Sequence, residues 1–133
     1  MRFLVTHPPD PRPALVVETV PHVDAATIAT FKEALLRLSC PNGLIFDEKD
    51  CVILRDTYSS LDVTSLAEDG RVATERLLAH VADGRALEQR VFDWLRSMAA
   101  SWNDTLPTEQ DVAAPFITDI VPAVSGSSIR QVA

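Results

Sequence analysis

The sequence has few of the residues on which common catalytic sites depend. Its four glycines are isolated from one another, so no glycine-rich loop is present to cradle a phosphate. Its two cysteines, Cys40 and Cys51, do not form the CxxC pair that is typical of zinc and redox sites. No serine stands in a Gly-x-Ser-x-Gly setting, which excludes the nucleophile elbow of a hydrolase. We expect two buried, reduced thiols and no catalytic triad.

Positive charge is also scarce. The chain has only two lysines, Lys32 and Lys49, and its net charge is −7. Non-specific affinity for nucleic acid comes mainly from lysine and arginine side chains that displace counterions from phosphates. The arginines can still form a local basic stripe, so nucleic acid stays open as a partner, although the net charge does not favour it.

Long apolar runs are absent, so we expect no segment that spans a bilayer. Prolines from Pro8 onward interrupt the N-terminal region, which argues against a signal peptide and predicts a cytoplasmic protein. The length of 133 residues and the 47% apolar content indicate one globular domain. We expect this domain to span residues 1–124 and residues 125–133 to form a flexible tail.

The first half of the chain predicts a compact α/β unit. Strands are expected over Arg2–Thr6 and Ala14–Val20, and the second of these is apolar enough for the middle of a sheet. The spacing of apolar residues predicts a helix over Asp24–Ser39. The runs Leu44–Phe46 and Cys51–Leu54 flank a polar turn and predict a β-hairpin. A helix between two strands implies a crossover, so we expect a mixed sheet.

The second half predicts mainly helices. One is expected from Ser65 or Arg71 to Val81, and a longer one over Ala86–Trp102. Residues Pro115–Val124 are apolar but contain a proline, which predicts an edge strand or an extended docking segment. The expected fold is therefore an α/β sheet flanked by two C-terminal helices.

The longer of these helices has a broad apolar face. Trp94, Met98 and Trp102 recur on it at helical spacing. Such a face packs either on the sheet or on a partner. We take these three residues as candidate interface anchors for a protein partner or for a homodimer.

Two acidic residues and their context suggest an ancestry. Pro9-Asp10 precedes the apolar strand, which ends in Glu18-Thr19-Val20 and is followed by the helix and the hairpin. This order, over about residues 9–58, resembles the core of the PD-(D/E)xK nuclease-like superfamily. The nearest likeness is to the N-terminal nuclease domains of type I restriction subunits. The resemblance implies a restriction-endonuclease-like fold.

The resemblance also implies roles for individual residues. Asp10 and Glu18 match the two acids that hold Mg²⁺, whose charge stabilises a phosphoryl transition state. The superfamily places its catalytic lysine two residues after the second acid, where this chain has Val20. Lys32, on the following helix, is a candidate replacement. His7 and His22 flank the same strand and could join the two acids around a transition metal.

Three functions follow from these observations. The first is a catalytically inactive nuclease-like domain that binds a protein partner or itself, with no cofactor. The second is a divalent-metal-dependent nuclease that uses Asp10, Glu18 and Lys32 to hydrolyse DNA. The third is a regulator that senses a small ligand on the same scaffold. Fold alone does not choose among them.

Overall fold

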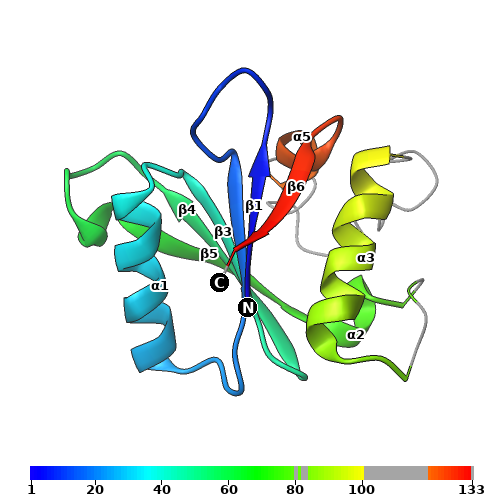
Figure 1. Ribbon diagram of the computed structural model, residues 1–133. Helices are drawn as coiled ribbons and strands as arrows, with labels where there is room; N and C mark the ends of the chain where they lie inside the picture. The colour runs from blue at the N-terminus through cyan, green and yellow to red at the C-terminus, as the bar shows by residue number, and fades with distance from the viewer. Residues whose placement is uncertain (80, 82–83, 101–119, 133) are drawn as a thin grey trace.

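The computed structural model describes residues 1–79, 81, 84–100 and 120–132. Its centre is a six-stranded mixed sheet in the order β5-β4-β3-β2-β1-β6 (Figure 1). The strands are β1 (Arg2–Thr6), β2 (Leu15–Thr19), β3 (Asn42–Phe46), β4 (Asp50–Asp56), β5 (Leu66–Ala73) and β6 (Ser128–Val132). The helices are α1 (Ala25–Arg37), the 3-10 turn η1 (Val63–Ser65), α2 (Thr74–Leu77), α3 (Leu87–Ala100) and α5 (Val121–Val124).

The register of the sheet confirms the predicted α/β class. β2 and β3 are parallel and α1 connects them, whereas the other neighbouring strands pair antiparallel. The β3–β4 hairpin forms as the apolar runs predict. β2 lies within the sheet, and Leu15, Val16 and Val17 are fully buried because both faces are covered.

Helix α1 covers one face of the sheet. Asp24 caps it: the Asp24 carboxylate accepts from the Thr27 N–H, and the Thr27 hydroxyl accepts from the Asp24 N–H. Phe31 and Leu35 are buried against the sheet. A Cβ on Gly43 of β3 would lie 2.7 Å from Leu35 Cδ1, so the glycine allows the helix to approach this closely.

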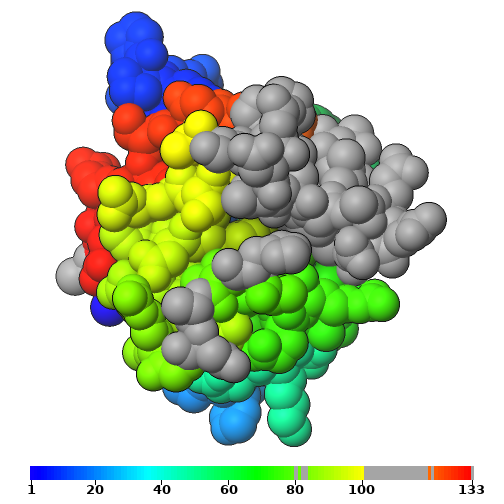
Figure 2. Space-filling view, turned by 90° about the vertical axis from the view of Figure 1, so that its right-hand side faces the viewer, coloured from blue at the N-terminus to red at the C-terminus, as the bar shows by residue number. Residues whose placement is uncertain are grey.

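Helices α2, α3 and α5 cover the other face (Figure 1). Their buried side chains form one apolar cluster with alternate residues of the strands. Phe46 of β3 meets Trp94 of α3 edge to face, with ring centroids 5.7 Å apart. In the view of this side, α3 lies beside the C-terminal strand and the β1–β2 loop projects beyond both (Figure 2). None of the helices in the described ranges combines the length and the apolar content that crossing a bilayer requires.

The structure corrects the helix predicted from Ser65 or Arg71 to Val81. Residues Leu66–Ala73 form the edge strand β5, Ser65 closes the 3-10 turn η1, and Thr74–Leu77 are the α-helical part of the residues described in this range. Alanine, glutamate, arginine and leucine favour a helix locally, but the open edge of β4 pairs with this segment along its length. Tertiary pairing therefore overrides local propensity here.

The C-terminal predictions are also corrected. Residues Val121–Val124 are helical, so they are neither an edge strand nor an extended segment, and residues 115–119 lie outside the described part. The predicted flexible tail is wrong for Ser128–Val132, which pair antiparallel with β1. The chain thus completes its sheet with its last described residues.

Candidate functional site

Asp10 lies in the loop that joins β1 to β2. It is exposed, and its N–H donates to the His7 carbonyl in a turn at 3.0 Å. The Arg12 N–H donates to Asp10 Oδ1 at 3.0 Å, and the Arg12 guanidinium lies 3.6 Å from the same oxygen. The backbone hydrogen bond, aided by the charge of Arg12, lowers the pKa of Asp10 below its usual value. The residue is an ionised carboxylate in a solvated turn.

Glu18 lies near the C-terminal end of β2, away from the loop that carries Asp10. It pairs with Arg2 in the register of β1 and β2, and Arg2 Nη2 donates to Glu18 Oε1 at 2.7 Å. The guanidinium therefore neutralises the carboxylate that the resemblance assigns to a metal. Val20, at the position of the missing lysine, packs against the apolar cluster beneath α1.

The structure does not bring the two predicted metal ligands together. Asp10 lies in the loop that precedes Leu15, the first residue of β2. Glu18 lies three residues after Leu15 on the same strand. At about 3.3 Å per strand residue this displacement is about 10 Å, and the loop projects away from the sheet. A shared cation needs both carboxylates within a few ångströms of one point.

Lys32 does not supply the missing group either. It lines a surface groove with Glu68 and Arg71 of β5, at the far edge of the sheet. β3 and β4 stand between that edge and β2, which carries Glu18. Neighbouring strands are about 4.8 Å apart, so Lys32 is directed away from the predicted acid.

His7 and His22 do not form the predicted metal site with the two acids. His7 Nε2 lies 2.7 Å from the Ala123 carbonyl, and since a carbonyl only accepts, Nε2 carries the proton. This bond ties the β1–β2 loop to α5. His22 is exposed in the turn before α1. Across the described ranges, no group of three or more His, Cys, Asp and Glu side chains is placed to hold a metal ion.

The predicted interface anchors on α3 are corrected as well. Trp94 is 3% exposed and Met98 is 1% exposed, both within the cluster on the sheet. They cannot anchor a partner, because the chain's own strands already cover them. The broad apolar face of α3 is used internally, and Trp102 lies outside the described residues.

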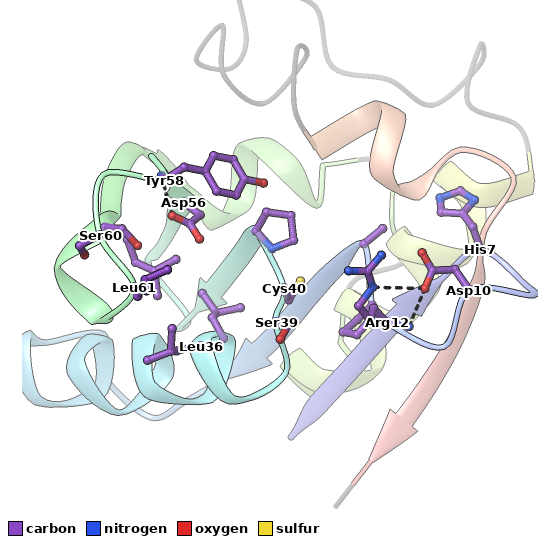
Figure 3. A pocket seen from close by; sticks show the side chains of 16 residues that line it. His7, Asp10, Arg12, Leu36, Ser39, Cys40, Asp56, Tyr58, Ser60 and Leu61 are labelled. Carbon is purple, nitrogen blue, oxygen red and sulfur yellow. Dashed lines mark hydrogen bonds and ion pairs between the residues drawn. The ribbon is translucent and has the colours of Figure 1, made fainter.

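A different surface has the properties of a binding site. A groove of about 510 Å³ opens at the end of the sheet where β2 and β3 begin. We call it the end groove. Its walls come from the β1–β2 loop (residues 7–14), the C-terminal end of α1 (residues 35–41) and the β4–β5 loop (residues 56–66). In Figure 3, Leu36, Tyr58 and Leu61 lie toward one side, and Asp10 and Arg12 lie toward the other.

The β4–β5 loop presents its apolar side chains on a closed frame. The N–H and the hydroxyl of Thr57 donate to the Ser65 carbonyl at 2.8 and 2.7 Å, which joins the base of the loop. Between them, Tyr58 has a φ of 58°, a left-handed conformation that is unusual for a bulky residue. The Tyr58 N–H donates to Asp56 Oδ1 at 2.8 Å and holds this conformation. Leu61, further along the loop, is 99% exposed.

The thiol at the wall of the end groove is not activated. Cys40 is the thiol at its wall, but it is buried, and its Sγ donates to the Asn42 carbonyl at 3.2 Å. Burial raises the pKa of Cys40 to about 11, so the thiolate nucleophile is not populated near neutral pH. Asp56 is a half-buried acid in the groove, and its Oδ1 accepts the Tyr58 N–H.

Sequence reasoning did not identify this groove. The signal present is a tyrosine and a leucine in an otherwise polar stretch, Tyr58-Ser-Ser-Leu61-Asp62. Leu36 gives no separate signal, because it falls next to the apolar stripe of α1. Only the folded chain shows that these three side chains face the same opening.

Comparisons with known proteins leave the site to be judged on its geometry. No family model, no curated protein and no solved structure matches the chain. The nuclease-like ancestry therefore stays a prediction.

Proposed function

We propose that this chain is a catalytically inactive domain that binds a protein partner through the end groove. One observation supports this proposal most directly. Among the described residues, four large apolar side chains are exposed, and three of them, Leu36, Tyr58 and Leu61, line this one groove. Single exposed apolar residues are ordinary, but a group around a concave surface is typical of an interaction site.

The energetics of the β4–β5 loop support the same function. An exposed leucine and an exposed tyrosine contribute little to folding, since neither is removed from water. A left-handed tyrosine costs on the order of 1 kcal/mol. A loop that holds such residues in an ordered frame fits a surface whose apolar area is buried by a partner.

A restriction-endonuclease-like ancestry is part of this proposal. The order of elements along the chain, β2, α1, β3 and β4, is compatible with this ancestry, and so is the parallel pairing of β2 with β3. The separation of Asp10 from Glu18, and the ion pair between Glu18 and Arg2, support loss of any metal-dependent cleavage. The retained function would then be recognition.

Partner binding is tested with two substitutions that each introduce one aspartate, one inside the end groove and one outside it. We would crosslink the purified chain in lysate of its source organism, identify the captured protein, and measure its affinity directly by titration calorimetry. Leu61→Asp places a charge in the groove, and we expect it to weaken binding about 10-fold or more. Ala29→Asp, at an exposed position on α1 outside the groove, should leave the affinity unchanged. Equal affinity of all three proteins would contradict the proposal.

Catalytic inactivity is tested separately. Purified chain is incubated with linear, circular and single-stranded DNA in Mg²⁺ or Mn²⁺, and we expect no cleavage. Mn²⁺ should also leave the melting temperature unchanged, because a ligand that binds the folded state raises it. Cleavage that is lost in Glu18→Ala would replace this proposal with a nuclease.

A further inference from the structure

The end groove combines its apolar side with an acid, Asp56, that forms no ion pair among the described residues. Asp56 is half-buried at the end of β4, and it lines the groove beside Tyr58 (Figure 3). Its Oδ1 accepts the Tyr58 N–H at 2.8 Å. Within the described part of the chain, no lysine or arginine forms an ion pair with Asp56. The other groove acid, Asp10, has Arg12 at 3.6 Å.

The end of helix α1 adds to this negative potential. α1 runs toward the groove and ends at Arg37, and the following residues Ser39, Cys40 and Pro41 line the wall. The C-terminal end of a helix carries a partial negative charge of about half an electron. Arg37, in the last turn of α1, offsets part of this partial charge, so the Asp56 carboxylate is the main group that favours a positive charge in the groove.

The apolar side of the groove lies close to this acid. Tyr58 is two residues from Asp56, and Leu61 follows three residues later on the same loop. Leu36, across the groove on α1, is 41% exposed. A ligand that fills the opening therefore meets apolar carbon atoms and a carboxylate within one short segment.

These features distinguish among the possible occupants. A second copy of the chain brings a net charge of −7 toward a surface that is itself acidic, which opposes self-association. A small anion is also disfavoured, because Arg12 is the one arginine or lysine among the described groove residues and Asp10 already pairs with it. A basic protein segment with a bulky apolar side chain is complementary to both parts of the groove.

We propose that the end groove recognises a short segment of a different protein. In this segment an apolar side chain packs against Leu36 and Leu61, and a nearby lysine or arginine reaches Asp56. This inference rests on the proposed function and adds the chemical class of the partner.

The test selects ligands without assuming their identity. A random 12-residue peptide library displayed on phage is panned against the purified full chain, and the selected peptides are synthesised. We expect enrichment of a large apolar residue close to a lysine or arginine. Asp56→Asn retains an oxygen that can accept the Tyr58 N–H, so the loop stays intact while the charge is removed. It should weaken binding about 5-fold and flatten its salt dependence.

Two controls sharpen this result. Glu48→Gln removes an equal charge at an exposed position in the β3–β4 turn, at the other end of the sheet, and should change the affinity less than about 2-fold. Replacing the basic residue of the peptide by alanine should weaken its binding to the wild-type chain but not to Asp56→Asn. This coupling would not arise from a general loss of charge.

Each contrary result has a distinct meaning. The selected peptides could lack a basic residue, bind Leu61→Asp more weakly than the wild type, and bind Asp56→Asn as tightly as the wild type. That result would overturn this inference and leave the proposed function standing. Peptides that bind Leu61→Asp as tightly as the wild type would contradict both proposals. A dimer in light scattering that Leu61→Asp dissociates would make a second copy the occupant and overturn the basic-segment inference.

Discussion

The two ends of the sheet differ in how many backbone N–H groups their acidic side chains accept. At the end formed by the β3–β4 turn, which we call the Asp47 end, Asp47 is 8% exposed. Its Oδ1 accepts the N–H groups of Lys49 and Asp50, each at 2.7 Å, and its Oδ2 accepts the Val23 N–H at 2.9 Å. The Thr74 hydroxyl donates to the Asp47 carbonyl at 2.8 Å. One residue thus joins the β3–β4 turn to the segments that begin α1 and α2.

The end groove lies at the opposite end and is built differently. There Asp56 accepts one backbone N–H, while Leu61 and Tyr58 stand in solvent. We therefore expect side chains at the Asp47 end to contribute stability and those of the end groove to contribute to the proposed binding. Substitutions at the two ends should therefore separate folding from binding.

The largest effect is expected at the Asp47 end. Asp47→Ala leaves three backbone N–H groups without their acceptor, which should lower the free energy of unfolding by about 3 kcal/mol. Asp47→Asn keeps one oxygen and should cost less than half of that. Urea denaturation measures both. A loss below about 1 kcal/mol for Asp47→Ala would break the comparison, because the turn would then not depend on this side chain.

A second substitution tests the frame of the end groove. Gly43→Ala places a Cβ 2.7 Å from Leu35 Cδ1 and 2.8 Å from Phe31 Cε2. Overpacking of a buried contact costs about 2 kcal/mol, and it should shift the C-terminal half of α1 outward. We expect lower stability in urea and weaker groove binding together. Unchanged binding would show that the groove tolerates movement of this helix.

The pH dependence of stability should follow Asp47. Its burial alone would raise its pKa, but the N–H donors of Val23, Asp50 and Lys49 outweigh burial and lower the pKa below the usual value of 3.8. The unfolded chain therefore takes up this proton first as the pH falls. The stability that the ionised Asp47 contributes is complete well above pH 4 and is lost below it.

This dependence is measured as a difference, because Asp10, Asp24, Asp62 and Glu75 also have lowered pKa values. We compare urea unfolding of the wild type and Asp47→Asn from pH 7 to pH 3. The advantage of the wild type should shrink in acid. An advantage that stays constant over this range would rule out Asp47 as the source.

The smallest effect is expected at the end groove, and it has the opposite sign. Tyr58 is 76% exposed, so Tyr58→Asn gives up little packing, and asparagine accepts the left-handed conformation more readily. The free energy of unfolding should rise by about 0.5 kcal/mol, while groove binding falls. A loss of stability would show that the tyrosine ring contributes to folding.

The first half of the fold could be predicted from the sequence because each element carries a local signal. The Leu15–Val17 run, the cap at Asp24 and the polar turn around Asp47 each have one dominant structural solution. The segment Leu66–Ala73 does not, because its residues favour a helix and only pairing with β4 makes it a strand. The same holds for Ser128–Val132, which becomes a strand because β1 offers an open edge.

The candidate site was harder to predict for a related reason. The motif around Asp10 and Glu18 gave two acids but not their separation along the hairpin, which depends on the β1–β2 register. The apolar face with Trp94 was recognised, yet the sequence cannot distinguish a sheet from a partner as its cover. The end groove depends on three segments that meet only in the folded chain.

The pairing of β6 with β1 has a practical consequence for binding experiments. Arg2 and Val132 are register partners, and the Met1 amino group lies 3.3 Å from the Thr19 carbonyl. The first and the last described residues therefore lie together at the Asp47 end of the sheet. A biotin or a fusion tag attached at either terminus would leave the end groove facing the solution. Surface-based binding assays can therefore use either attachment point and should return the same affinity.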